Sequence, residues 1–139
     1  MKGIRVLGAC LFAAVLCSLS YAEVDRGLVY YGDCDEDFLA PGEINCAEVF
    51  VEIPEYQKIL QESLDTNSGK YWTLLRKAND RFQDAVRKIA KRHGLDLVCE
   101  RGLLSDSERE VIREKRGDQQ YKFDYTEEVK AIVNQGKAA

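Results

Sequence analysis

The clearest pattern of hydrophobic positions in the chain is a seven-residue repeat between residues 71 and 93. Apolar side chains recur at alternating steps of four and three residues, and Lys, Arg, Asp and Gln fill most positions between them. This spacing places one apolar stripe along a helix. It predicts a helix of about 24 residues whose last turn, Lys91-Arg92-His93 before Gly94, holds the cations that suit the helix dipole. The stripe consists of Tyr71, Leu75, Ala78, Phe82, Ala85 and Ile89.

A shorter helix is predicted over residues 54–64. Pro54 suits a first helical position because its missing N–H has no intrahelical partner there, and residues 65–69 have turn chemistry. The two helices together predict an antiparallel helical (coiled-coil) hairpin over residues 54–93. Trp72 lies off the seam, and we interpret it as a contact for something other than its own hairpin. The apolar stripe of the shorter helix has members four residues apart, Tyr56, Leu60 and Leu64.

Short β-strands are predicted around the hairpin, because β-branched or alternating apolar residues mark three segments, 44–51, 95–99 and 121–125. Ser105 and Glu108 have the spacing of a capping box, which predicts a short charged helix to about residue 115. Thr126 is predicted to cap a final helix that closes at Gly136. The predicted fold class is therefore α+β, a small β-sheet with a projecting antiparallel helical hairpin and a short C-terminal helix.

The first 22 residues have the three-part pattern of a cleavable secretory signal. Lys2 and Arg5 precede an apolar run from Val6 to Leu19, and Ser20 and Ala22 supply the small residues of a cleavage site. The run of about 14 residues is shorter than the ~20 that span a bilayer, so a retained anchor is the weaker alternative. We expect cleavage after Ala22 and a periplasmic or secreted protein without a stable membrane span.

The rest of the chain is predicted to hold a loosely ordered acidic lead-in at residues 23–43, with at most one short strand, and a single domain at residues 44–139. A length of 139 residues with 45% hydrophobic and 32% charged residues suits one domain. The net charge of −4 becomes −6 when residues 1–22 leave, because two basic residues and no acidic residue are lost. An acidic protein is a poor partner for nucleic acid or an anionic membrane surface.

Little in the sequence indicates chemistry. Three cysteines remain after cleavage, and an oxidising compartment favours one disulfide between two of Cys34, Cys46 and Cys99, with three pairings open. None of them forms a close pair, and the only histidine, His93, is interpreted as a helix-end residue, so we expect no metal site. Without a nucleophile–base pair or a phosphate loop, we expect no catalytic residues, no cofactor and no enzyme.

Short sequence motifs occur in three segments, 47–60, 85–102 and 123–133, and their order along the chain can be compared with that of a known family. The motif positions are Val49, Phe50, Pro54, Glu55, Ala90, Gly94, Asp96, Leu97, Val98, Asp124, Thr126 and Val129. With these motifs the chain resembles the Skp/OmpH family of exported chaperones for outer-membrane proteins, as a shortened and acidic member. The resemblance implies a homotrimer with a shared β core, whose helical hairpins hold unfolded clients without ATP and without catalytic residues.

Two functions follow as hypotheses. The first is an exported, ATP-independent holdase or assembly factor that binds unfolded envelope or outer-membrane proteins, with Trp72 as a client contact. The alternative is a non-catalytic structural or interaction protein of the cell envelope on the same scaffold, with the acidic lead-in and the charged insertion at residues 105–120 as contact surfaces. In both, the partners are proteins and the chain is expected to form a homo-oligomer.

Overall fold

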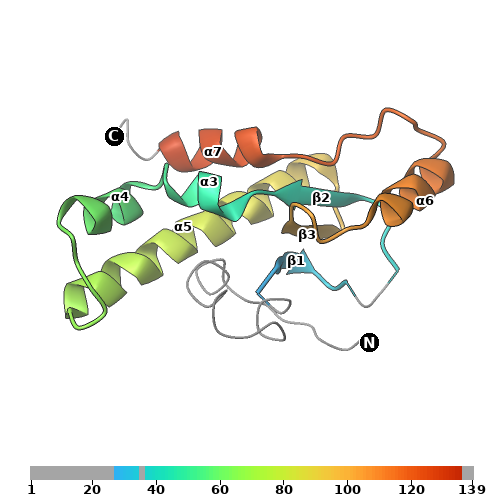
Figure 1. The fold of residues 1–139 in the computed structure, drawn as a ribbon. Helices are drawn as coiled ribbons and strands as arrows, with labels where there is room; N and C mark the ends of the chain where they lie inside the picture. Colours follow the sequence, from blue (N-terminus) through green and yellow to red (C-terminus); the bar gives the residue numbers. More distant parts are fainter. Residues whose placement is uncertain (1–26, 35–36, 136–139) are drawn as a thin grey trace.

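The computed structural model describes residues 27–34 and 37–135 of the chain. The predicted signal peptide at residues 1–22 and the predicted end of the last helix at Gly136 lie outside the described residues. Within the described ranges the chain forms a small sheet with helices around it (Figure 1), which confirms the predicted α+β class. The helices are α3 (Cys46–Phe50), α4 (Pro54–Gln61), α5 (Gly69–His93), α6 (Asp106–Arg116) and α7 (Thr126–Asn134).

The sheet of the described residues consists of β1 (Val29–Gly32), β2 (Pro41–Ile44) and β3 (Leu97–Glu100). The strand order is β1-β3-β2, with β2 parallel and β1 antiparallel to the central β3. A parallel pair needs a crossover connection. Here α3, α4 and α5 form that connection between β2 and β3, so the hairpin is an insertion between two neighbouring strands.

The strand predicted at residues 44–51 is wrong, because only Ile44 belongs to a strand and α3 begins at Cys46. The side chain of Asn45 accepts a hydrogen bond from the backbone N–H of Glu48 at 3.2 Å, which caps a short helix. The strand itself starts earlier, at Pro41-Gly42, where the hydrophobic pattern gives no signal. The lead-in at residues 23–43, predicted to hold at most one short strand, contains β1 and also the first three residues of β2, so this prediction is wrong.

The strand predicted at residues 121–125 is also wrong. The segment makes one isolated bridge to β2, in which Glu43 donates its N–H to the oxygen of Phe123 at 2.6 Å and accepts from the N–H of Tyr125 at 2.9 Å. The rings of Phe123 and Tyr125 belong to different hydrophobic clusters, so the alternating aromatics do not share one buried face.

The remaining elements follow the sequence closely. β3 overlaps the strand predicted at residues 95–99, and α6 has the predicted capping box between Ser105 and Glu108. α7 begins at Thr126 as expected, but Thr126 is not its cap. The carboxylate of Asp124 accepts from the N–H of Thr126 at 2.9 Å instead. Asp124 lies two residues before Thr126, and its side chain thus satisfies one of the backbone N–H donors in the first turn of α7.

Hydrophobic clusters lie on both sides of the sheet, because successive side chains of a strand point to opposite faces. On β3, Val98 belongs to the larger cluster, which includes α3, α5 and α7, while Leu97 and Cys99 belong to a smaller one with α6. In Figure 1, α7 and α3 lie along the C-terminal part of α5, and the other end of the hairpin extends away from α6. The sheet is therefore the layer between the hairpin side and the α6 side.

One ion pair joins α6 to the sheet. Glu43 in β2 is 3% exposed, and its carboxylate accepts from Nη2 of Arg109 in α6 at 2.9 and 3.1 Å. The side chain of Arg109 is 21% exposed. A carboxylate in such a place is stable only while it is paired.

We predict that Arg109→Ala lowers the free energy of unfolding by about 3–5 kcal/mol, because the mutation leaves a buried carboxylate without its partner. Urea unfolding followed by circular dichroism measures this change. The double variant Glu43→Gln/Arg109→Ala removes the unpaired charge and should recover part of the loss. A loss below about 1 kcal/mol in the single variant would mean that water reaches Glu43.

Candidate functional site

The two hairpin helices are paired over only part of their length. At 1.5 Å per residue, α4 is about 12 Å long and α5 about 37 Å. Arg81 of α5 donates to both carboxylate oxygens of Glu55 in α4, at 2.9 and 2.7 Å, and Lys70 lies 2.7 Å from Glu62 just beyond α4. These contacts confirm an antiparallel hairpin, and they show that α4 covers only the N-terminal part of α5.

The apolar stripe of α5 is buried mainly in the core of its own chain. Tyr71 is half-buried, and the other members of the stripe, Leu75, Ala78, Phe82, Ala85 and Ile89, are at most 2% exposed. The ring of Phe82 packs against Tyr30 of β1 and Phe50 of α3, with centroids 5.2 and 5.5 Å apart. The C-terminal part of the repeat therefore packs on the sheet, α3 and α7 and offers no seam to another molecule.

On α4 the predicted seam is corrected at Leu60. Leu60 is 54% exposed, whereas its neighbour Ile59 is 4% exposed and packs inside the hairpin. Tyr56 is half-buried, with its ring edge-to-face on Phe50. Leu64 lies beyond the helix, because α4 ends at Gln61 and the following turn contains a residue with a φ of 52°. The adjacent apolar pair at 59 and 60 made the helical period ambiguous in the sequence.

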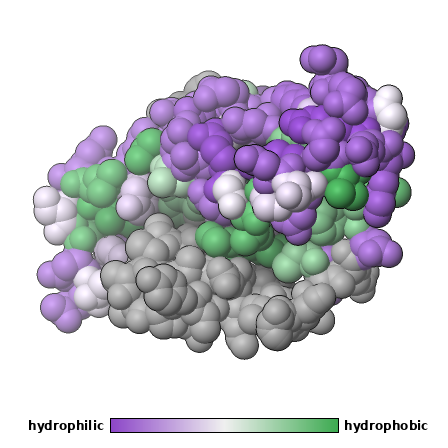
Figure 2. Space-filling model, turned by 45° about the vertical axis from the view of Figure 1, so that its right-hand side comes forward, coloured by the Kyte–Doolittle hydropathy of each residue, from purple (hydrophilic) through white to green (hydrophobic). Residues whose placement is uncertain are grey.

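The hairpin end, by which we mean Leu60, the turn at residues 62–68 and Trp72, presents apolar side chains to solvent. Trp72 is 51% exposed; its indole N–H donates to the oxygen of Thr66 at 2.8 Å, and its ring lies edge-to-face on Tyr71. The hydrogen bond holds the ring against the turn. Figure 2 shows hydrophobic side chains at the surface on the left, at the hairpin side of the molecule.

Other half-exposed apolar side chains lie singly elsewhere in the described chain, at Leu39, Val51 and Val111. Isolated exposed apolar residues are ordinary on protein surfaces. The hairpin end differs because two large apolar side chains, Leu60 and Trp72, flank one turn of a projecting element. Exposed apolar side chains brought close together are candidates for contacts with other molecules.

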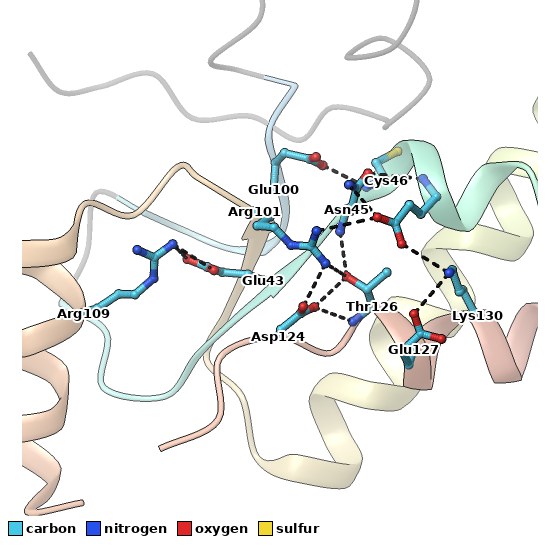
Figure 3. A network of polar contacts seen from close by, with 11 residues as sticks. Glu43, Asn45, Cys46, Glu100, Arg101, Arg109, Asp124, Thr126, Glu127 and Lys130 are labelled. Atoms are coloured by element: carbon cyan, nitrogen blue, oxygen red, sulfur yellow. Dashed lines mark hydrogen bonds and ion pairs between the residues drawn. The ribbon is translucent and has the colours of Figure 1, made fainter. Parts of the chain in front are cut away.

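A second candidate is the polar network beside α3 and α7 (Figure 3). Arg101 donates to Asp124 at 2.8 Å and to the hydroxyl of Thr126 at 3.2 Å, and the same hydroxyl accepts from the N–H of Asn45 at 2.9 Å. The carboxylate of Glu48 lies 3.2 Å from Lys130. Every group in this network has a partner, so its role is to join β3, α3 and the start of α7.

Glu100 at the end of β3 is a half-buried carboxyl group beside this network. One of its oxygens accepts from the hydroxyl of Tyr30 at 2.6 Å and from the N–H of Cys46 at 3.1 Å. Burial raises the pKa of Glu100, and it also raises the pKa of the Tyr30 hydroxyl far above its ordinary value. Sequence reasoning missed this pair because 70 positions separate its members. With both hydrogen bonds directed inward, the pair anchors β1 and α3 to β3.

The cysteines do not pair as expected. The predicted disulfide between two of Cys34, Cys46 and Cys99 is not formed: Cys46 is disulfide-bonded, but to neither Cys34 nor Cys99. Cys99 on β3 and Cys34 belong to the cluster on the α6 side of the sheet, while Cys46 packs in the larger cluster on the other side. The sheet thus separates Cys46 from the other two. Burial raises the pKa of the Cys99 thiol well above its usual range, which keeps it protonated.

His93 occupies the last position of α5, as the sequence indicated. Its Nε2 lies 2.7 Å from a carboxylate oxygen of Glu128 in α7, and its ring centroid lies 4.8 Å from that of Tyr125, with the two rings tilted by 47°. In the described part of the chain no group of His, Cys, Asp and Glu side chains has the arrangement of a metal site. None of the helices described has the length and apolar character that a bilayer crossing requires.

The corrected register of α4 makes a matched pair of substitutions informative. We predict that Ile59→Ala lowers the free energy of unfolding by about 2–5 kcal/mol because it opens a cavity between the hairpin helices. Leu60→Ala, on the next position of the same helix, should cost less than about 1 kcal/mol. Urea unfolding of both variants measures the difference, and equal losses would contradict the register.

A pH-dependent effect is expected at Glu100. Its folded-state pKa is raised, so the native state binds this proton more tightly than the unfolded chain and ionisation costs stability as the pH rises. Glu100→Gln keeps an oxygen acceptor for Tyr30 and Cys46 without the charge. We predict that the variant is at least as stable as the parent at pH 7, and that any gain disappears as the pH falls below about 4.3. Unfolding free energies across this range measure it; a less stable variant at pH 7 would show that the carboxylate is required.

Comparison of the chain with protein-family models, with curated proteins and with solved structures found no match. The resemblance to the Skp/OmpH family therefore rests on the sequence motifs alone.

Proposed function

We propose that this protein is a non-catalytic, ATP-independent binding protein, an exported holdase or assembly factor whose hairpin end contacts unfolded segments of envelope proteins. The observation that carries the proposal is the exposure of Leu60 and Trp72 on either side of one turn, 54% and 51%, next to the N-terminus of α5, the longest helix among the described residues. Unfolded polypeptides expose apolar side chains that folded ones bury. A surface that buries them without chemistry holds such chains in solution.

Charge supports the same kind of partner. α5 carries eight Lys or Arg residues and two Asp residues, whereas the whole chain has a net charge of −4. A positive helix on an acidic protein attracts acidic polypeptide segments to the hairpin and leaves most of the remaining surface repulsive to them. The occupant we propose is therefore an unfolded segment with both apolar and acidic residues.

The resemblance extends the proposal to the assembly. In that family three subunits share a β core, and three hairpin ends would hold one client more tightly than one end does, because the second contact becomes intramolecular. The mass of the purified protein, measured by light scattering, tests this part of the proposal. A monomeric mass would show that the trimeric assembly is wrong.

A second candidate is an interaction protein with one folded partner in the envelope. The burial of the C-terminal part of the α5 stripe favours it, because the large exposed apolar side chains of the described hairpin are only Leu60 and Trp72 at its end, and two side chains enclose little volume. Crosslinking in intact cells separates the candidates. One defined folded partner favours the interaction protein, and many unfolded ones favour the holdase.

We predict that the protein suppresses aggregation when a urea-denatured outer-membrane protein is diluted into buffer with it, as measured by light scattering. The double variant Leu60→Ser/Trp72→Ser should lose most of this activity, because burial of two half-exposed apolar side chains contributes about 1 kcal/mol each, enough for a tenfold change in affinity.

Val111→Ser is the matched control, because Val111 is 45% exposed on α6, away from the hairpin. It should suppress aggregation as the parent does. Circular dichroism and urea unfolding verify that all variants fold. If the parent does not suppress aggregation at several-fold molar excess, the holdase function is wrong. If the double variant suppresses aggregation fully, the hairpin end is not the binding site.

A further inference from the structure

A groove lies on the hairpin between α4 and α5. It is lined by Pro54, Glu55, Lys58, Leu74 and Lys77, and its volume is about 310 Å³. This volume is at the small end of the range for ligand sites and suits one or two side chains. Pro54 and Leu74 are half-buried and supply an apolar lining. The groove is distinct from Leu60 and Trp72, which are not among its lining residues.

The charges in this groove are unbalanced. Both oxygens of Glu55 are occupied by Arg81, and this hydrogen bonding holds the pKa of Glu55 below its usual range. The carboxylate therefore stays ionised and its charge is matched within the hairpin. Lys58 and Lys77 are exposed, and neither has a carboxylate within 4.0 Å among the residues that the structure describes. By contrast, Lys70 is paired with Glu62.

Two unpaired ammonium groups beside an apolar lining define the chemistry of an occupant. An ammonium group is a compact point charge that accepts carboxylates in many orientations, whereas a guanidinium group prefers a fixed planar geometry. The site therefore suits a carboxylate whose exact position varies from one polypeptide to the next. An apolar side chain next to that carboxylate can cover Leu74 and displace water from the groove.

We propose that this groove binds an acidic and apolar segment of a partner polypeptide, with carboxylates on Lys58 and Lys77 and an apolar side chain against Pro54 and Leu74. This assignment adds a second binding site to the proposed function, and it rests on that function for the choice of a polypeptide as the partner. It gives the hairpin two contacts with different chemistry, an apolar one at its end and a charged one on its flank.

The experiment measures fluorescence anisotropy of a labelled peptide of alternating Glu and Phe residues, with a peptide that has Gln in place of Glu for comparison. The Glu peptide should bind more tightly, and added salt should weaken it, because the contacts are between exposed charges. In Lys58→Glu/Lys77→Glu the affinity for the Glu peptide should fall about tenfold, since two attractive contacts become repulsive. Lys58→Gln/Lys77→Gln should show a smaller loss in the same direction.

Lys88→Glu/Lys91→Glu is the matched control. It makes the same charge change on the exposed face of α5, and Lys88 is about 16 Å from Lys77 along the helix axis. This distance exceeds the screening length of about 10 Å at 0.1 M salt, so binding should change by less than about twofold. An equal loss of affinity in the control would show that the groove is not the binding site and that the peptide is attracted by the overall positive charge of α5. If a single-stranded oligonucleotide or anionic lipid vesicles bound more tightly than the Glu peptide through the same lysines, the proposal that the occupant is a polypeptide would be wrong.

Failure of this assignment and failure of the proposed function give different results. If the parent suppresses aggregation but the groove variants bind the Glu peptide as the parent does, the groove assignment alone is wrong. If the parent does not suppress aggregation and the Glu peptide still depends on Lys58 and Lys77, the holdase is wrong and the groove stands. Circular dichroism verifies folding, and binding of the Gln peptide that is unchanged between parent and groove variants verifies that the hairpin surface is intact.

Discussion

The burial of one apolar stripe of α5 against the sheet and its neighbouring helices is the interaction on which the rest of this structure depends. Phe82 is at its centre, in contact with Tyr30 of β1 and Phe50 of α3. Val129 and Val133 of α7 are fully buried in the same cluster. Without this contact the four-residue strands lose the larger of the two hydrophobic clusters that cover the sheet, and a small sheet depends on such packing for its stability. The C-terminal part of α5 is thus a component of the hydrophobic core.

This arrangement divides α5 into two functional parts. Its C-terminal part is buried by its own chain, and its N-terminal part has only the short α4 as cover. At the turn only α4 and α5 meet, and they bury Ile59 and Leu75 between them, whereas Leu60 and Trp72 lie outside this contact and reach solvent. The exposed apolar side chains of the hairpin are therefore few, and they support a small contact site more directly than a cage.

Charged groups are arranged differently in the two parts. Around the sheet, the carboxylates of buried Glu43 and half-buried Glu100 accept hydrogen bonds, and they join elements that are far apart in the sequence. Buried, hydrogen-bonded polar groups of this kind specify how elements meet. On the hairpin, Lys58 and Lys77 stay exposed beside an apolar lining. The basis for placing binding at the hairpin is the contrast between hydrogen-bonded carboxylates at the base and two hairpin lysines, Lys58 and Lys77, that form no ion pair within 4.0 Å in the described part of the chain.

Part of this organisation was readable from the sequence alone, because it is local. The long α5 follows from its repeat, its end follows from Gly94, and α6 follows from the capping box of Ser105 and Glu108. These signals act within one helical turn, so they hold in any tertiary context. The exposure of Trp72 is compatible with its place off the repeat, and the α+β class followed from the order of such elements.

The tertiary structure decided what depends on contacts between distant residues. β2 forms at Pro41-Gly42 because β3 offers it a parallel partner, while the apolar run after Ile44 becomes a helix that Asn45 caps. Residues 121–125 look like a strand but make only one bridge, since their two buried rings pack on different sides of the sheet. Ile59 and Leu60 are equally apolar, and only the position of α5 determines which one is buried. Local patterns set helices and their ends, whereas the choice among apolar faces required the folded chain.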